Sequence, residues 1–189
     1  MDALLNHIQK QIRLSEKDKQ IIAEYFTQQQ IAKKAILLKE GSLCKDLYFV
    51  VQGCLRLYFI DEKGKEQITH FAIENWWLTD YLAFHKEGQA AFNIQAIEPS
   101  TLLTISHQQL EQLTERVPLM DRYLRYNLQT SFGAAQRRVK YMYENTKEQY
   151  FREFIDKYPE FVQRVPQYML ASFLDLTPEY LSELRKKYK

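Results

Sequence analysis

Polar side chains near the carboxyl end of the chain have the types and spacing of a surface that contacts DNA. Thr177 followed by Pro178 is a helix start, because threonine can accept a hydrogen bond from the first turn and proline tolerates the first helical position. The helix predicted after this start presents acidic, hydroxyl and basic groups, which can bind base edges and phosphates. The candidate DNA contacts are Gln167, Tyr168, Thr177, Glu179, Tyr180, Ser182, Glu183, Arg185 and Lys186.

Apolar side chains in the same segment have the spacing of a helix-turn-helix. They recur on one face of each of two short helices and once in the turn between them. Asp175 occupies the turn, where glycine is usual, and can take the left-handed conformation at a higher cost than glycine. A plain helical hairpin would use the same apolar positions, and this alternative stays open. The inward positions are Leu170, Ala171, Leu174, Leu176, Leu181 and Leu184.

Catalytic and metal chemistry have little support in the sequence. His7, His70, His85 and His107 are scattered, without the spacing of metal ligands. The chain contains no phosphate-binding glycine loop and no nucleophile elbow. We therefore expect neither an enzyme nor a metal site.

Composition and charge limit the remaining classes of protein. The 189 residues, 46% of them hydrophobic, suffice for one large domain or two small ones. Cys44 and Cys54 are too few for a disulfide scaffold and are interpreted as buried hydrophobes, with a redox pair as the alternative. No apolar run approaches a membrane span and no signal peptide is visible, so we expect a cytoplasmic protein without membrane contact.

The net charge of +2 permits nucleic acid binding without requiring it. Residues 137–189 contain eleven Lys or Arg against eight Asp or Glu, whereas residues 1–136 contain fifteen against sixteen. The basic excess therefore lies in the part of the chain that carries the predicted helix-turn-helix, where it could contact phosphates.

The first two thirds of the chain change from helical to strand patterns and back. Two amino-terminal helices are predicted, the second opening at Ser15. Short β-rich runs separated by turns then favour an antiparallel barrel or sandwich over alternating βαβ units. A short helix is predicted over 107–114, and a further helix begins at Asn145-Thr146 and stops at Pro159. The predicted strands are 47–51, 54–60, 67–71, 91–96 and 101–105.

A long helix beginning at Pro118 has apolar residues every three, four or seven positions. A helix of roughly 25 residues projects farther than a small barrel needs, so a coiled-coil-like dimer seam is predicted. Packing of the stripe on the chain's own barrel is the alternative. The candidate dimer contacts are Met120, Leu124, Leu128, Ala135, Val139 and Met142.

The order of these parts resembles the Crp/Fnr family of transcription regulators over essentially the whole chain. Residues 37–58, L-L-K-E-G-S-L-C-K-D-L-Y-F-V-V-Q-G-C-L-R-L-Y, are similar to the family's β-roll, with Gly41 and Gly53 at its turn glycines. The resemblance implies an α+β fold: an antiparallel, jelly-roll-like β-roll with flanking helices, a long dimerisation helix and a small carboxy-terminal helix-turn-helix. The corresponding domains are 1–116, a β-roll sensor, 117–144, the dimerisation helix, and 145–189, the DNA-binding domain.

Residues 75–96 match the family's phosphate-binding cassette and are called the cassette below. They depart from the pattern of the members that bind nucleotides. Nucleotide-binding members carry a Gly-Glu pair and then an arginine that pairs with the cyclic phosphate. Burying a phosphate without such a cation is costly, so binding of cAMP or cGMP is not expected, no cofactor is evident, and an unidentified small-molecule effector stays open. Of adjacent tryptophans, one usually lies in a core and the other at a surface, although stacking on a ligand is an alternative. Thr79, Asp80 or Tyr81 stands near the Gly-Glu positions, and Ala90 or Ala91 stands where the family has the arginine. The candidate effector positions are Trp76, Trp77, Thr79, Asp80, Tyr81, Ala90 and Ala91.

The predicted recognition helix departs from the family in two ways. Glu179 matches the family's base-reading glutamate, but Glu183 stands where the family has arginine, and the chain stops at Lys189 before the usual β-hairpin wing. Phosphate contacts are then expected from the basic end, from the first helix, and from Arg137 and Arg138. The predicted partners are double-stranded DNA and a second copy of the chain, with RNA polymerase as a further candidate. The alternative is an adaptor that does not bind DNA.

Overall fold

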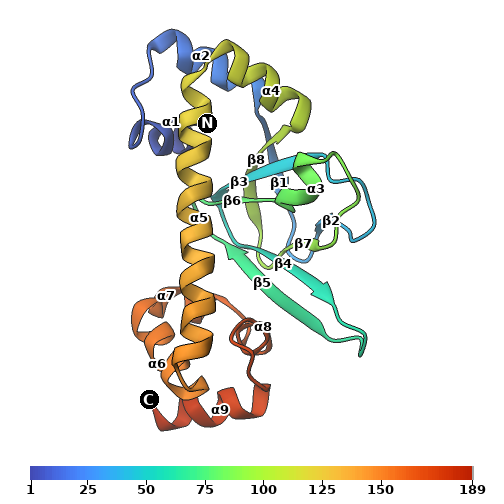
Figure 1. Ribbon diagram of the computed structural model, residues 1–189, viewed down its shortest axis with the longest axis vertical. Coiled ribbons are helices and arrows are strands. Elements are labelled where there is room, and N and C mark those ends of the chain that lie inside the picture. Colours follow the sequence, from blue (N-terminus) through green and yellow to red (C-terminus); the bar gives the residue numbers. More distant parts are fainter. Residues whose placement is uncertain (189) are drawn as a thin grey trace. The chain divides into compact units, whose positions relative to one another are not determined.

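The computed structural model describes residues 1–188, which divide into two compact units (Figure 1). Unit 1 contains Met1–Phe59 and Thr69–Leu128, and unit 2 contains Ile60–Ile68 and Gln129–Lys189. Lys189, the last of the predicted basic residues, lies outside the described residues. Among the described residues, no helix is both long and apolar enough to cross a bilayer.

Unit 1 begins with the two predicted helices, α1 (Asp2–Gln9) and α2 (Glu16–Tyr25). A capping box starts α2: the Ser15 hydroxyl accepts a hydrogen bond from the backbone N–H of Asp18 at 3.1 Å, and the Asp18 carboxylate accepts one from the N–H of Ser15 at 2.9 Å. These bonds satisfy two of the donors that a helix start leaves without partners. The predicted opening of the second helix at Ser15 is therefore confirmed.

Within the described part of the chain, eight strands form two four-stranded sheets, with the orders β1-β8-β3-β6 and β2-β7-β4-β5. The five predicted strands are present and pair antiparallel where their registers are defined, for example Phe49 opposite Leu103. The three strands that the sequence did not predict, β1, β2 and β6, are an exposed polar edge strand and two very short ones. The strands are β1 (Thr27–Ile31), β2 (Ile36–Leu38), β3 (Asp46–Gln52), β4 (Leu55–Ile60), β5 (Glu66–Ala72), β6 (Trp77–Leu78), β7 (Asn93–Ala96) and β8 (Ser100–Ser106).

Three helices complete the packing of unit 1: α3 (Tyr81–His85), α4 (His107–Arg116) and the first part of α5 (Leu119–Glu144). The core contains apolar residues of both sheets together with Met120 and Tyr123 of α5, both fully buried. Cys44 and Cys54 are buried free cysteines, as predicted. Burial raises the pKa of the Cys44 thiol, so the neutral form persists and the alternative of a reactive pair loses support.

Unit 2 contains the rest of α5 and four short helices. Thr146 caps the first of these through a bond from the N–H of Gln149 at 3.2 Å, as the sequence predicted. Pro159 ends that helix but also occupies the first position of a helix that the sequence did not predict. The four helices are α6 (Lys147–Lys157), α7 (Pro159–Arg164), α8 (Gln167–Phe173) and α9 (Pro178–Lys187).

Candidate nucleic-acid interface and effector region

Helices α8 and α9 form the predicted helix-turn-helix around a shared apolar core. All the predicted inward residues are at least 97% buried, and Phe151 of α6 and Val165 join them. Each buried leucine contributes roughly 1.5–3 kcal/mol relative to an exposed one, so packing rather than the intrinsic propensity of two short helices holds the pair. The inward residues are Leu170, Ala171, Leu174, Leu176, Leu181 and Leu184.

The turn between the two helices has Asp175 in the left-handed conformation, with φ of 54°. The N–H of Leu176 donates back to the carbonyl of Ala171 at 2.9 Å, as in a Schellman helix end. Lys147 of α6 donates to the Asp175 carbonyl at 2.6 Å and lies 3.0 Å from its carboxylate. These contacts with Lys147 stabilise the left-handed conformation of Asp175, which glycine would adopt with less strain.

Helix α9 starts at the cap that the sequence predicted. The Thr177 hydroxyl accepts a hydrogen bond from the N–H of Tyr180 at 3.2 Å, and Pro178 occupies the first helical position. This start directs the first turn of α9 outward, since Thr177, Pro178 and Glu179 are exposed while Leu181 is fully buried.

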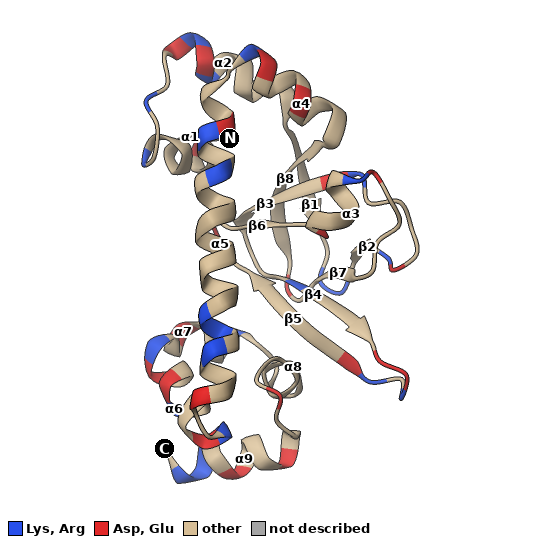
Figure 2. Ribbon diagram, viewed as in Figure 1, with Lys and Arg blue, Asp and Glu red and all other residues tan. Residues whose placement is uncertain are grey.

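The outer face of α9 carries residues 179, 182, 183 and 186, at helical spacings of three and four. Glu179, Glu183 and Lys186 are exposed, and Ser182 is partly exposed. Figure 2 shows the acidic residues in the first part of α9 and the basic residues at its end. The reading face therefore combines a hydrogen-bond acceptor near its start with cations near its end.

The cations around this face differ in their availability. Lys187 lies 2.6 Å from Glu148 of α6, and this neighbour holds the pKa of the Glu148 carboxyl below its usual range. Arg138 of α5 is partly buried: its guanidinium lies 4.0 Å from the Phe173 ring centroid and donates to the Phe173 carbonyl at 2.7 Å. Packing within unit 2 therefore engages the Arg138 guanidinium, which makes it less available to a phosphate than the exposed Arg137.

The remaining predicted phosphate contacts lie on the surface of unit 2. Gln167 and Tyr168, at the start of α8, are exposed, and Arg137 is exposed on α5. Among residues 1–188, the side chains of Arg185 and Lys186 make no hydrogen bond or ion pair. These two cations are free to meet a phosphate backbone.

The predicted dimer residues on α5 separate into buried and exposed positions. Met120 is fully buried in the core of unit 1 and Leu124 is partly buried against it. From Leu128 onward the stripe is exposed, and Phe132 at 65% exposure belongs to it. The exposed positions are Leu128, Phe132, Ala135, Val139 and Met142, which alternate at spacings of four and three.

The cassette region is organised by Asp80, which is 5% exposed. Its carboxylate accepts hydrogen bonds from the N–H of Ala83 at 3.2 Å and from the N–H of Ala91 at 2.8 Å. The first bond caps α3, and the second links the helix to the segment that follows it. Ala90 is buried and Ala91 is exposed, so neither position offers a cation.

The other candidate effector residues mostly serve the packing of unit 1. The Thr79 hydroxyl is buried and donates to the Asp46 carbonyl at 2.9 Å. Trp77 is 7% exposed and Trp76 is 46% exposed, which confirms the expectation of one core and one surface tryptophan. Tyr81 is 38% exposed, on α3.

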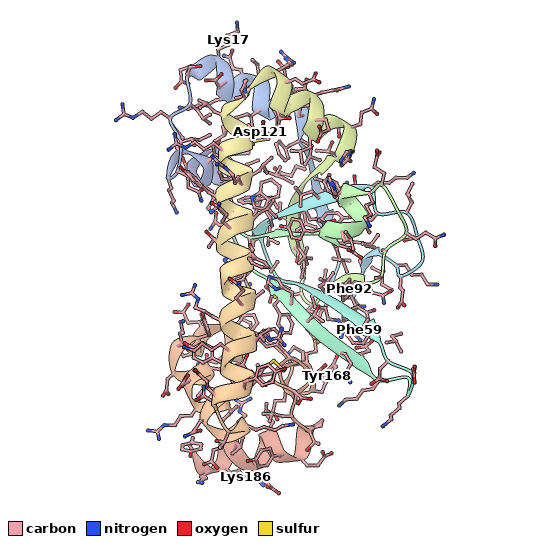
Figure 3. All side chains as sticks on the ribbon, in the orientation of Figure 1. Lys17, Phe59, Phe92, Asp121, Tyr168 and Lys186 are labelled. Atoms are coloured by element: carbon pink, nitrogen blue, oxygen red, sulfur yellow. The ribbon has the colours of Figure 1, made fainter. Side chains whose placement is uncertain are left out.

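The end of the cassette is anchored by an aromatic pair. Phe92 packs edge-on against Phe59 of β4, with ring centroids 6.2 Å apart (Figure 3). The pair fixes the chain directly after Ala91, whose N–H binds Asp80. The backbone and side chains of the cassette are thus bonded to, or packed on, other groups of unit 1.

The part of the chain that contains the cassette is similar to a known protein family. Residues 28–117 match the cyclic nucleotide-binding domain family. This part of the chain is therefore similar to a cyclic nucleotide-binding domain. The chain is also 26% identical over 167 residues to the anaerobic regulatory protein of Pasteurella multocida, covering 82% of this chain and 60% of that protein. The chain therefore spans about 60% of the length of that relative.

Two solved structures share the fold of this chain. FixK2 from Bradyrhizobium japonicum has a TM-score of 0.74 at 16% identity, covering 86% of this chain and 83% of its own. A transcriptional regulator of the Crp/Fnr family from Eubacterium rectale has a TM-score of 0.70 at 15% identity, covering 93% of this chain and 83% of its own. The resemblance to the Crp/Fnr family and the predicted α+β fold with an antiparallel roll are confirmed.

Several residues that shape these regions were not predicted from the sequence. Lys147 and Glu148 of α6 hold the turn and the end of the helix-turn-helix, and Ser172 of α8 bonds to the backbone of residues 66 and 68 at 2.8 and 3.0 Å. The role of Lys147 had one signal in the sequence: Asp175 stands at a turn position that favours glycine, and an aspartate there is stabilised by a partner. Ser172 gave no signal, because its partners are far away in the sequence.

Proposed function

We propose that the chain is a sequence-specific, DNA-binding transcription regulator of the Crp/Fnr type. The observation that carries this proposal is the outer face of α9, which begins at the Thr177 cap and ends at Lys186. Lys186 and the neighbouring Arg185 have no partners among residues 1–188. A helix of these dimensions enters the major groove, where its first turns meet base edges and its end lies near phosphates.

Four polar residues of α9 have proposed roles that suit their chemistry. The Glu179 carboxylate can accept a hydrogen bond from a cytosine amino group. Ser182 can bond to either kind of base-edge group, and Arg185 and Lys186 can neutralise phosphates. Gln167 and Tyr168 can contact the backbone from α8.

Dimerisation through α5 is part of the proposal. The exposed apolar positions from Leu128 to Met142 repeat at spacings of four and three, which is the seam of a coiled coil. Because Met120 is buried in the core of unit 1, the proposed seam begins at Leu128, about two turns later than the apolar pattern suggested. A two-fold dimer would present two α9 helices to a near-palindromic site with half-sites about one helical turn apart. RNA polymerase is a further candidate partner at such a site.

A matched pair of variants tests the seam. In sedimentation equilibrium, Val139→Glu combined with Phe132→Glu should convert the chain to a monomer, because two charges would be buried in an apolar seam. Gln136→Glu, at an exposed position on the same helix, should leave the dimer intact. A monomeric wild-type chain would refute this part of the proposal.

We further infer that cAMP and cGMP do not bind this part of the chain, the cassette included. A buried cyclic phosphate needs a cation and backbone donors, and here Ala90 and Ala91 supply no cation. The Asp80 carboxylate already accepts from two backbone N–H groups of the cassette and would repel a phosphate brought beside them. In a thermal-shift titration, neither nucleotide should raise the melting temperature, and clear stabilisation by cAMP would contradict this inference.

A non-DNA-binding adaptor is the second candidate function. It is favoured by the exposed carboxylate of Glu183, which adds repulsion from phosphates, and by the pairing of Lys187 with Glu148. Such a protein would keep the roll and helix-turn-helix for protein contacts. It differs from the first proposal in having no salt-dependent affinity for duplex DNA.

Selection of bound duplexes from a random pool separates the two functions. The chain should enrich a near-palindromic sequence at low salt, and the enrichment should decline as salt rises, because phosphate contacts release counterions. Lys186→Ala should weaken binding to all duplexes about equally, whereas Glu179→Ala should relax the preference for one base pair. No enriched sequence at the lowest salt concentration would favour the adaptor.

A further inference from the structure

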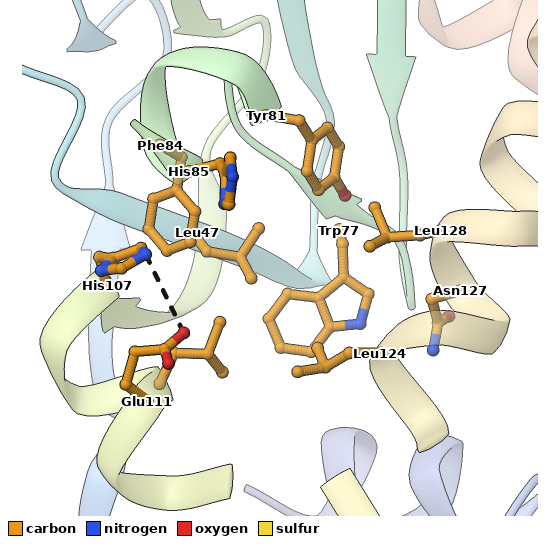
Figure 4. A pocket seen from close by; sticks show the side chains of 11 residues that line it. Leu47, Trp77, Tyr81, Phe84, His85, His107, Glu111, Leu124, Asn127 and Leu128 are labelled. Atoms are coloured by element: carbon orange, nitrogen blue, oxygen red, sulfur yellow. Dashed lines mark ion pairs between the residues drawn. The ribbon is translucent and has the colours of Figure 1, made fainter. Parts of the chain in front are cut away.

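Unit 1 contains a cavity of about 270 Å³ between α3, α4, α5 and the strands β3 and β6 (Figure 4). Its apolar lining includes Leu47, Trp77, Tyr81, Phe84, Leu124 and Leu128. No residue of the sheet β2-β7-β4-β5 lines it, so it lies outside the interior of the β-roll. Asp80 and Ala91 do not line the cavity, although α3, the helix that Asp80 caps, forms one of its walls.

The aromatic walls of this cavity are held in place before any ligand arrives. The indole N–H of Trp77 donates to the Tyr123 hydroxyl at 2.8 Å, and that hydroxyl bonds to Nδ1 of His7 at 2.7 Å. Phe84 is buried and packs edge-on against His107, with ring centroids 5.2 Å apart. A flat ligand would meet fixed aromatic faces and would lose little affinity to ordering of the protein.

The polar edge of the cavity consists of His85, His107, Glu111 and Asn127. The nitrogens of His107 lie 3.8 Å from Glu87 and 4.0 Å from Glu111, so carboxylates already neighbour the imidazole. An anionic ligand would be repelled by these carboxylates, whereas a hydroxyl or N–H could donate to one of them or to an imidazole nitrogen. Although the Tyr81 side chain is 38% exposed, desolvation of its hydroxyl by its neighbours raises its pKa to about 12, so the hydroxyl stays protonated and can donate in turn.

We propose that this cavity binds a small neutral aromatic compound, of one ring or two fused rings, that carries a hydroxyl or N–H group. The size follows from the volume, because an apolar cavity of about 150 Å³ already holds benzene. The aromatic character follows from the walls, and the neutral donor from the carboxylates at the edge. The ligand would touch α3 through Tyr81 and α5 through Leu124 and Leu128. The proposal rests on the cavity alone and does not depend on DNA binding.

Nuclear magnetic resonance of the full chain can test the site with 4-ethylphenol as the probe. The chain has two tryptophans and therefore two indole N–H signals, which Trp76→Phe assigns. The probe should shift the Trp77 signal in a saturable manner and leave the Trp76 signal in place. Phenylacetate, a ring of similar size with a carboxylate, should bind at least tenfold more weakly.

Two substitutions locate the binding and provide its control. Leu124→Phe should fill the cavity and weaken the probe at least tenfold, and Leu128→Phe at the exposed rim serves the same purpose if the first variant fails to fold. Leu82→Phe is the matched control, since Leu82 is exposed on α3 and does not line the cavity. Its affinity for the probe should equal that of the wild type.

Other results would overturn the proposal. A non-saturable shift, equal movement of both indole signals, or unchanged affinity in both filling variants would exclude this cavity as the site. Phenylacetate binding as tightly as 4-ethylphenol would contradict a neutral ligand. A Trp77 signal that moves on dilution of the chain alone, with no response to the probe, would show that a second copy covers the cavity instead.

Discussion

The buried hydroxyl of Tyr123 makes the most quantitative prediction for unit 1. Tyr123 is fully buried, and its oxygen accepts from the Trp77 indole and bonds to His7. Tyr123→Phe removes this oxygen without changing the apolar area, and it leaves the buried indole N–H of Trp77 without an acceptor. A buried unsatisfied donor costs about 1–3 kcal/mol, while the partly exposed His7 can bond to water. We expect a loss of about 2 kcal/mol in the free energy of unfolding.

Urea unfolding followed by tryptophan fluorescence measures this loss in the correct unit. Both Trp76 and Trp77 belong to unit 1, so their emission reports its unfolding and not that of unit 2. A loss of about 2 kcal/mol corresponds to a melting temperature roughly 4–8 °C lower. Tyr143→Phe is the control, because Tyr143 is 88% exposed, and it should stay within about 0.5 kcal/mol of the wild type. A loss below about 0.5 kcal/mol in Tyr123→Phe would refute the role of the buried oxygen.

Three further predictions concern pH, the turn and the roll. Burial, and to a smaller extent the charge of Lys10, lowers the pKa of His7 below its ordinary value of 6.5, so the unfolded chain binds a proton at His7 more readily than the folded chain does. The urea midpoint of unit 1 should therefore fall as pH drops below about 6.5. His7→Gln should make this fall smaller. Asp175→Ala should lower the melting temperature of unit 2, seen by circular dichroism, whereas Asp175→Gly should nearly preserve it, because glycine accepts the left-handed turn at little cost. Gly53→Ala should prevent folding of unit 1, since a Cβ there would lie 2.2 Å from the Ser100 hydroxyl. The matched Gly41→Ala, with open space around it, should cost only about 1 kcal/mol by thermal unfolding.

Local patterns predicted those parts of the fold in which neighbouring residues decide the structure. Capping residues such as Ser15, Thr146 and Thr177 marked helix starts, and apolar β-branched or aromatic runs marked the central strands. Strand β1, T-Q-Q-Q-I, carries no such signal, because it is an exposed edge strand held by its pairing with β8. Helix α7 was missed because Pro159 can both end one helix and begin another.

The candidate sites could be predicted where they lie on one helix and not where they depend on distant partners. The spacing of α9 placed Glu179 and Lys186 on one exposed face. By contrast, the Arg138 guanidinium packs on Phe173 and bonds to its carbonyl, and these two residues are 35 positions apart in the sequence. The bond from Ala91 to the Asp80 carboxylate depends on the tertiary packing of the cassette, which composition and periodicity do not specify.

The measurement that tests DNA recognition by α9 most directly is the salt dependence of binding to the enriched duplex, followed by fluorescence anisotropy. The wild-type chain is compared with Arg185→Ala combined with Lys186→Ala, and Lys63→Ala in the loop between β4 and β5 serves as the control. Each lost phosphate contact should lower the slope of log affinity against log salt by about 0.9. We expect a shallower slope in the double variant and the wild-type slope in the control. Equal slopes in all three proteins would contradict the assignment of α9 as the DNA-binding helix.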